Sequence, residues 1–126
     1  MMIPTQCQLW QKEQVTSEDI QLGSHFEILN TFEDSSHLTR LLLRCRDCGQ
    51  LYFYEFYEEI DWEGGNDPHY LTFLPIESEE EARRLAKMAP VSSVAGMAPI
   101  ELLQLYPRLQ GAWPADAERL TIRWIK

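Results

Sequence analysis

Length, composition and charge narrow the class of protein to which this chain belongs. Its 126 residues include 11 Lys or Arg and 20 Asp or Glu, a formal net charge of -9, so nucleic acid and anionic membranes, which bind clustered basic side chains, are not expected as partners. The sequence has neither an apolar run of the roughly 20 residues that cross a bilayer nor a secretory signal pattern at its start. We expect a cytoplasmic protein with a single hydrophobic core.

The first predicted elements are an arm and two strands. Residues 1–22 are mixed and polar, and a loosely ordered N-terminal arm is expected there. Residues 23–126 are expected to form one domain. Its first strand is predicted over residues 24–32, and the turn-forming sequence EDSS at 33–36 returns the chain as a second strand over 37–45.

The most informative stretch is LLLRCRDCGQLYFYEFYEEIDW, which is predicted to form two antiparallel strands joined by a tight turn. Because side chains alternate across a sheet, a register that pairs Arg44 with Leu51 also pairs Arg40 with Glu55, an opposite-charge contact of roughly 0.2 to 1 kcal/mol. The same register creates one apolar face, from the pairs Leu43 with Tyr52, Leu41 with Tyr54, and Thr39 with Phe56.

A fourth strand and a helix are predicted next. The glycine-rich sequence at 63–68 is typical of a hairpin loop, and residues 69–74 alternate as a strand that Pro75 ends. Ser78, with a glutamate three residues later, has the spacing of a capping box and predicts a helix that Pro90 ends.

The C-terminal part is predicted to add one helix and one strand. Pro99 suits the first turn of a short helix that runs through Tyr106 and stops at Pro107. Residues 107–116 are expected to form a loop, and residues 120–125 alternate as a final strand. The expected fold class is α+β: an antiparallel meander sheet of about five strands with two short helices packed on one face.

The sequence CRDCG is the chain's one chemically specific motif. Cys45 and Cys48 stand three residues apart, and Gly49 suits the positive backbone dihedral of a tight turn, as in one half of a zinc site. With a tight turn between the first two strands, His25 lies about level with Cys45, and a flexible N-terminal arm is able to deliver Cys7. Zinc is therefore the expected metal. Its candidate ligands are Cys7, His25, Cys45 and Cys48.

Two other interpretations of CRDCG stay open. The cysteines are also compatible with a turn that holds no metal, in which buried thiols act as small hydrophobes. A redox pair of the thioredoxin type fits less well, because that motif opens a helix after a strand and here it joins two strands. The cysteines number three, which is odd, so a disulfide framework is not expected and a reducing compartment is favoured.

An acidic and aromatic ladder follows the turn. It consists of Phe53, Glu55, Tyr57, Glu59 and Asp61, which alternate along one face of the predicted third strand. Aromatic rings among carboxylates are typical of an interface that offers charge complementarity to a basic protein, so these residues form the predicted partner-binding face. The alternatives are an ordinary solvated sheet face and a face covered by a helix.

The chain resembles two groups of bacterial proteins. One stretch resembles a group of small stand-alone bacterial proteins to which no activity is assigned; it reads CRDCGQLYFYEFYEEIDW and is followed by GGNDP and LPIESEEEA. In size, acidity and α+β build, the chain is also similar to immunity proteins of bacterial polymorphic toxin systems. This second resemblance implies a protein that binds and blocks a toxin by an acidic surface placed against a basic nuclease. Neither resemblance implies a catalytic residue.

The leading hypothesis is a non-enzymatic acidic binding protein, an immunity-type inhibitor that neutralises a basic toxin domain. The sequence has no phosphate loop, no nucleophilic serine elbow and no HExxH motif. A small zinc-binding regulatory protein is the alternative, and an enzyme of unknown class is the third. Under the leading hypothesis, Lys substitutions at Glu55, Glu59 and Asp61 are expected to abolish partner capture and leave folding intact.

Overall fold

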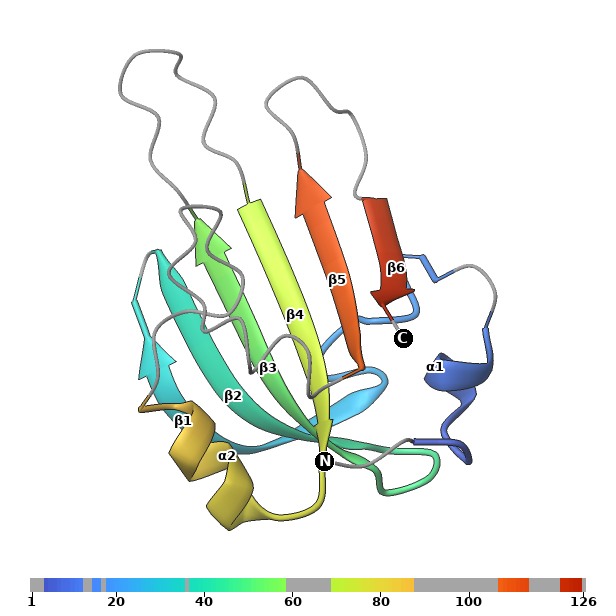
Figure 1. Ribbon diagram of the computed structural model, residues 1–126, viewed down its shortest axis with the longest axis horizontal. Coiled ribbons are helices and arrows are strands. Elements are labelled where there is room, and N and C mark those ends of the chain that lie inside the picture. The colour runs from blue at the N-terminus through green and yellow to red at the C-terminus, as the bar shows by residue number, and fades with distance from the viewer. Residues whose placement is uncertain are drawn as a thin grey trace.

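A computed structural model describes residues 4–12, 15–16, 18–35, 37–58, 69–87, 107–113 and 121–125. Within these residues, six strands form one antiparallel sheet in which each strand pairs with the next along the chain (Figure 1). The strands are β1 Phe26–Asp34, β2 Leu38–Cys45, β3 Leu51–Glu58, β4 His69–Ile76, β5 Arg108–Trp113 and β6 Thr121–Ile125. The helices are α1 Gln8–Gln11 and α2 Glu79–Leu85. The predicted α+β meander is confirmed.

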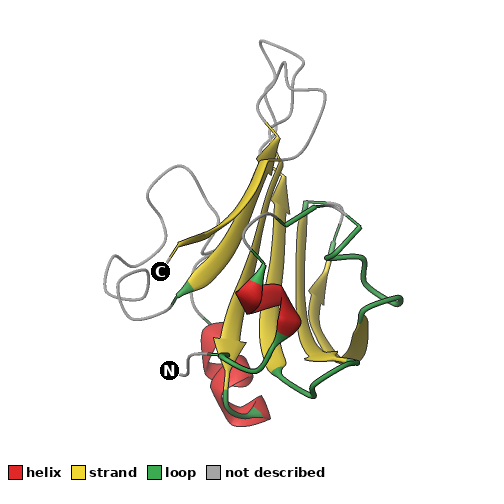
Figure 2. Ribbon diagram, turned by 90° about the vertical axis from the view of Figure 1, so that its right-hand side faces the viewer, coloured by secondary structure: helices red, strands yellow, loops and turns green. Residues whose placement is uncertain are grey.

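The two helices lie near the end of the sheet that carries the β2–β3 turn, and they cover opposite faces (Figures 1 and 2). On one face, Ala82 and Leu85 of α2 belong to a cluster with Phe53. On the other face, Leu9 of α1 belongs to a cluster with Tyr52. The expected pair on one face consisted of α2 and a helix over 99–106, and α1 was not part of it. The N-terminal arm contains α1, and the helix predicted over 99–106 lies outside the described residues.

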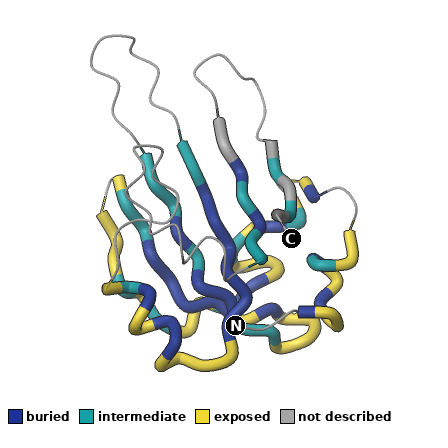
Figure 3. The backbone as a smooth tube through the Cα atoms, viewed as in Figure 1, coloured by how far each residue is buried: buried dark blue, intermediate teal, exposed yellow. Residues whose placement is uncertain are grey.

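The β2–β3 hairpin has the predicted register at every predicted pair, including Arg44 with Leu51 and Arg40 with Glu55. Alternation along β2 sends Leu43 to the α1 face and Leu42 to the α2 face. Both faces of the central strands are therefore covered, and the buried residues concentrate along β2, β3 and β4 towards the helices (Figure 3). A strand covered on both faces tolerates consecutive apolar residues such as Leu41, Leu42 and Leu43 of β2.

The C-terminal hairpin corrects the loop predicted over 107–116. Residues 108–113 form β5, which pairs with β4 on one side and with β6 on the other. Gly111 and the polar residues around it leave the segment without clear alternation. Pairing on both edges and the burial of Leu109 stabilise it as a strand, and local propensity reflects neither of these contacts.

Pro75 lies inside β4 and does not end it. It pairs with Tyr52 of β3, and the strand continues to Ile76. The pairing of β4 with β5 extends only to Phe73, so Pro75 has no β5 residue opposite it. A residue without an N–H is tolerated in a strand where one of the two edges is no longer paired.

The predicted capping box starts α2. Ser78 Oγ accepts a hydrogen bond from the Glu81 N–H at 3.2 Å, and Glu81 Oε1 accepts one from the Glu77 N–H at 2.9 Å.

We expect Ser78→Ala to lower the free energy of unfolding by about 1 kcal/mol, because a helix N–H loses its acceptor. Urea unfolding would measure the loss. Ser78→Thr keeps the hydroxyl and should recover most of it; equal losses in the two variants would contradict the role of the cap.

Candidate metal centre

The β2–β3 turn brings Cys45 and Cys48 together. Cys45 ends β2, its N–H donates to the Gln50 carbonyl at 2.8 Å, and its carbonyl accepts from the Gly49 N–H at 2.9 Å. Gly49 has a φ of 80°, and an added Cβ would meet nothing within 4 Å. The glycine is therefore required for its backbone conformation and not for space.

The third thiol comes from the N-terminal segment. Cys7 precedes α1, and its N–H donates to the Pro4 carbonyl at 3.0 Å. The helix is held against the far edge of the sheet, where Trp124 Nε1 of β6 donates to the Leu9 carbonyl at 2.8 Å. Trp10 adds an edge-to-face contact to the Trp124 ring, with centroids 4.7 Å apart. These contacts position Cys7 over the β2–β3 turn that carries Cys45 and Cys48.

The sulfur atoms of Cys7, Cys45 and Cys48 all lie within 4.8 Å of one another. In tetrahedral zinc sites the Zn–S bond is about 2.3 Å, which separates two sulfurs by about 3.8 Å. Cys7 is 1 % and Cys45 is 6 % exposed, whereas Cys48 is exposed. The buried Tyr52 hydroxyl donates to Cys7 Sγ at 3.0 Å, a contact of the kind that orients a metal ligand from the second shell.

The Cys48 thiol favours the protonated state in the absence of metal. Loss of solvent around its sulfur raises the pKa of Cys48 to about 12, and the adjacent Cys7 and Cys45 add to this rise against a lowering by the Gln50 backbone N–H. Cys48 is exposed as a residue, but its sulfur faces the two buried thiols. Burial also raises the pKa of Tyr52, so its hydroxyl stays a neutral donor. A soft cation that replaces the thiol protons would relieve the repulsion between thiolates.

This environment predicts the reactivity of Cys48. In chelator-treated protein, we expect slow alkylation by iodoacetamide at neutral pH, with a rate that still climbs between pH 9 and about 12, because the folded thiol has a pKa raised from 9.0 to about 12. In the unfolded chain, Cys48 loses its proton at a lower pH than in the folded protein. The free energy of unfolding of the metal-free protein should therefore fall as the pH rises through this window. Mass spectrometry of intact protein would give the rates. A Cys48 rate that levels off near pH 9 would contradict the prediction.

His25 does not join the three thiols. Phe26, not His25, pairs with Cys45, because the β1–β2 turn falls later than predicted and β1 contains two register shifts that leave an offset of one residue. His25 is exposed, and its carbonyl accepts from the Arg46 N–H at 3.0 Å. Phe26 is buried opposite Cys45, whereas His25 lies just before the first residue of β1 and is exposed.

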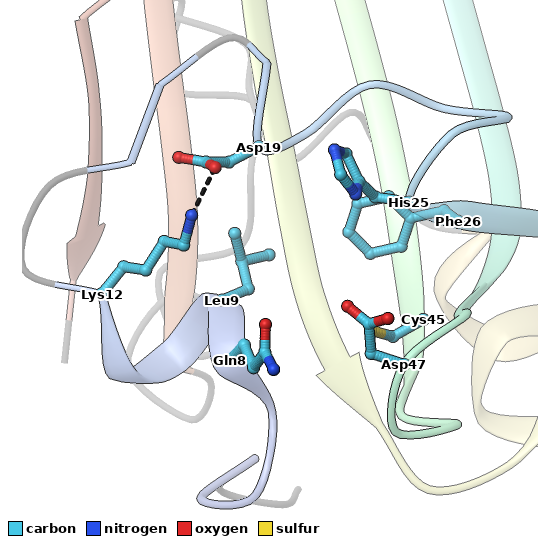
Figure 4. Close-up of a pocket in the computed structure, with 8 residues that line it drawn as sticks. All are labelled: Gln8, Leu9, Lys12, Asp19, His25, Phe26, Cys45 and Asp47. Carbon is cyan, nitrogen blue, oxygen red and sulfur yellow. Dashed lines mark hydrogen bonds and ion pairs between the residues drawn. The ribbon is translucent and has the colours of Figure 1, made fainter.

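The imidazole of His25 lines a small pocket of about 80 Å³ beside Cys45 (Figure 4). The Lys12–Asp19 ion pair closes one side of this pocket, and His25 lies across from it above the Phe26 ring. Among the described His, Cys, Asp and Glu side chains, none completes a set of four with the three thiols.

A larger cavity, of about 280 Å³, adjoins the centre at Cys7 and Cys48. It is lined by Gln6, Cys7, Cys48, Gly49, Gln50, Leu51, Ile76 and Glu77. Two of the three cysteines thus reach this cavity, and Cys45 reaches the small pocket.

The predicted partner-binding face is largely inside the protein where the structure describes it. Phe53 and Glu55 are 0 % exposed, and Tyr57 is half-buried. Glu59 and Asp61 lie outside the described residues. The cluster that includes α2 covers Phe53, so the aromatic ring belongs to the core, and Glu55 pairs with buried Arg40 at 2.9 Å. The expected tolerance of folding to Lys at Glu55 is therefore corrected.

Sequence reasoning missed Tyr52 and Trp124 as supports of the centre. Tyr52 was assigned to the apolar face, which is correct, but a sequence gives no sign of which atom its hydroxyl meets. The tryptophan acts across 115 positions of the chain, beyond any local pattern.

No helix in the described part of the chain is long and apolar enough to span a membrane. Comparison of the chain with protein-family models, with curated proteins and with solved structures found no match.

Proposed function

We propose that this protein is a small zinc-binding protein of regulatory type, whose metal is held by Cys7, Cys45 and Cys48. The observation that carries the proposal is the meeting of three thiols from two distant segments, with all sulfurs within 4.8 Å of one another. Three buried or adjacent thiols with no disulfide among them match the soft ligands that zinc prefers.

The metal would act as a cross-link between two segments of the chain. It would join the N-terminal segment that carries α1 to the β2–β3 turn, and so close the α1 face of the sheet over the cluster that contains Phe26, Tyr52 and Phe73. The short helix has only four residues, far fewer than an isolated helix needs, so its order depends on such tertiary contacts.

Metal content by elemental analysis tests the proposal. Untagged protein purified without chelator is expected to carry about one zinc per chain, because one three-thiol set is enough for one ion. Cys45→Ser should abolish it. Asp47→Asn changes a neighbouring residue outside the thiol set and serves as the matched control, with zinc retained. Absence of metal in the wild-type protein would exclude the proposal.

A second candidate function is binding of a basic protein, as in an immunity-type inhibitor. The net charge of -9 favours it, as do the exposed carboxylates Glu77, Glu79 and Glu80 around the start of α2. The product of a neighbouring toxin-like gene is the partner to test by co-purification. Capture should weaken strongly at about 1 M salt, where the screening length is about 3 Å; the failure of that product to bind at low salt would remove this candidate.

A further inference from the structure

The side of the thiol centre that faces the larger cavity is accessible. Cys7 and Cys48 line this cavity of about 280 Å³, several times the roughly 30 Å³ that one water molecule occupies. The Cys48 residue is exposed, whereas Cys7 and Cys45 are buried. A metal among the three sulfurs would therefore be shielded by protein on one side and open on the side of the cavity.

The three thiols do not fill all the coordination positions of a zinc ion. Zinc takes four ligands, and sites with three protein ligands hold an exogenous molecule in the fourth position. In the described part of the chain, Glu77 lines the cavity but its carboxylate lies outside the set of close ligand atoms, as does the imidazole of His25 in the smaller pocket. The Gln50 amide is engaged with the carbonyls of Leu51 and Ile76, at 2.9 and 3.1 Å.

We propose that the fourth coordination position faces this cavity and takes up a small exogenous thiol. The inference rests on the proposed zinc-binding function. A thiolate is a soft donor that matches the three protein sulfurs, and the cavity beside Cys7 and Cys48 has room for a small thiol. In the exchange, a Zn–O bond to water breaks, a Zn–S bond forms, and the proton of the incoming thiol passes to solvent.

An open fourth position would make the metal centre responsive to small thiols. Three protein sulfurs keep the metal in place, and the fourth position fills or empties with the concentration of small thiols. Cys7, which directly precedes α1, contributes one of the three sulfurs around that position.

Cobalt(II) replaces zinc in such sites and makes the ligand set visible, so the test begins with the full chain loaded with cobalt(II). Titration with 2-mercaptoethanol should shift the visible d–d absorption and saturate. Gln6→Trp narrows the cavity and should weaken the apparent affinity for the thiol by about tenfold or more. Gln8→Trp is the matched control, because Gln8 is also exposed in the same segment but lines the smaller pocket; its titration should match the wild type.

The outcomes separate the two proposals. Cobalt binding with a thiol-dependent spectrum supports both. Cobalt binding with a spectrum that thiol does not alter overturns the open position and leaves the zinc-binding function standing; a change of that spectrum in Glu77→Gln or His25→Ala would then identify the protein ligand that fills it. Failure to bind cobalt or zinc at all overturns both proposals. Equal thiol affinities of Gln6→Trp and Gln8→Trp would show that the thiol does not enter through this cavity.

Discussion

Glu55→Ala is expected to lower the free energy of unfolding by about 3 to 5 kcal/mol, because it leaves Arg40 charged and buried without its partner. Arg40 Nε donates to Glu55 Oε1 at 2.9 Å, and the two side chains are 7 % and 0 % exposed. Arg40 also donates to the Ala86 carbonyl at 2.7 Å, next to the last turn of α2. The substitution should therefore loosen α2 as well as the centre of the sheet.

Urea unfolding would measure the loss, with hydrogen exchange of the α2 amides as a local readout. The matched control is Glu79→Ala, which removes an ion pair of the same 2.9 Å length between exposed residues and should cost less than about 0.5 kcal/mol. The double variant Arg40→Met, Glu55→Leu replaces both charges by apolar groups of similar size and should recover most of the stability. A loss below about 1 kcal/mol in Glu55→Ala would show that the pair is solvated and not buried.

Under the proposed zinc-binding function, removal of zinc is expected to lower the free energy of unfolding by about 4 kcal/mol when free zinc was at about 1,000 times its dissociation constant. The physical reason is that the complete thiol set exists only in the folded chain, where Cys7 meets the β2–β3 turn. Loss of the metal should also release α1 from β6, which separates the rings of Trp10 and Trp124. Tryptophan fluorescence during thermal unfolding would report both effects.

Cys7→Ser is the control for this prediction. Its stability should not respond to chelator, because the metal no longer bridges the two segments, whereas the wild-type melting temperature falls. The affinity for zinc should rise with pH, since each thiol releases its proton on binding. A wild-type melting temperature that is unchanged by chelator in metal-replete protein would contradict the proposal that the metal cross-links the two segments.

The parts of the fold that followed from sequence are those with local causes. The β2–β3 register was predictable because a tight turn leaves few alignments, and only one of them places apolar residues together and Arg40 opposite Glu55. The start of α2 followed from Ser78 and the glutamate three residues later, which satisfy backbone N–H groups within one turn. Two of the three clustered thiols were evident in CRDCG, since a glycine-bearing turn converges two thiols locally.

The rest depended on contacts between segments far apart in the chain. The β1–β2 turn falls later than expected and the two bulges in β1 offset only part of that shift, so Phe26 and not His25 lies opposite Cys45. β5 became a strand through pairing with β4 and β6 despite its weak pattern. Glu55 is the clearest example of a residue whose environment depends on tertiary contacts. Alternation placed it on the correct face, but alternation cannot say whether that face meets water or a helix, because burial is a property of whatever packs on the sheet. Here the cluster that includes α2 covers that face, and a residue predicted to bind a partner became half of a buried ion pair.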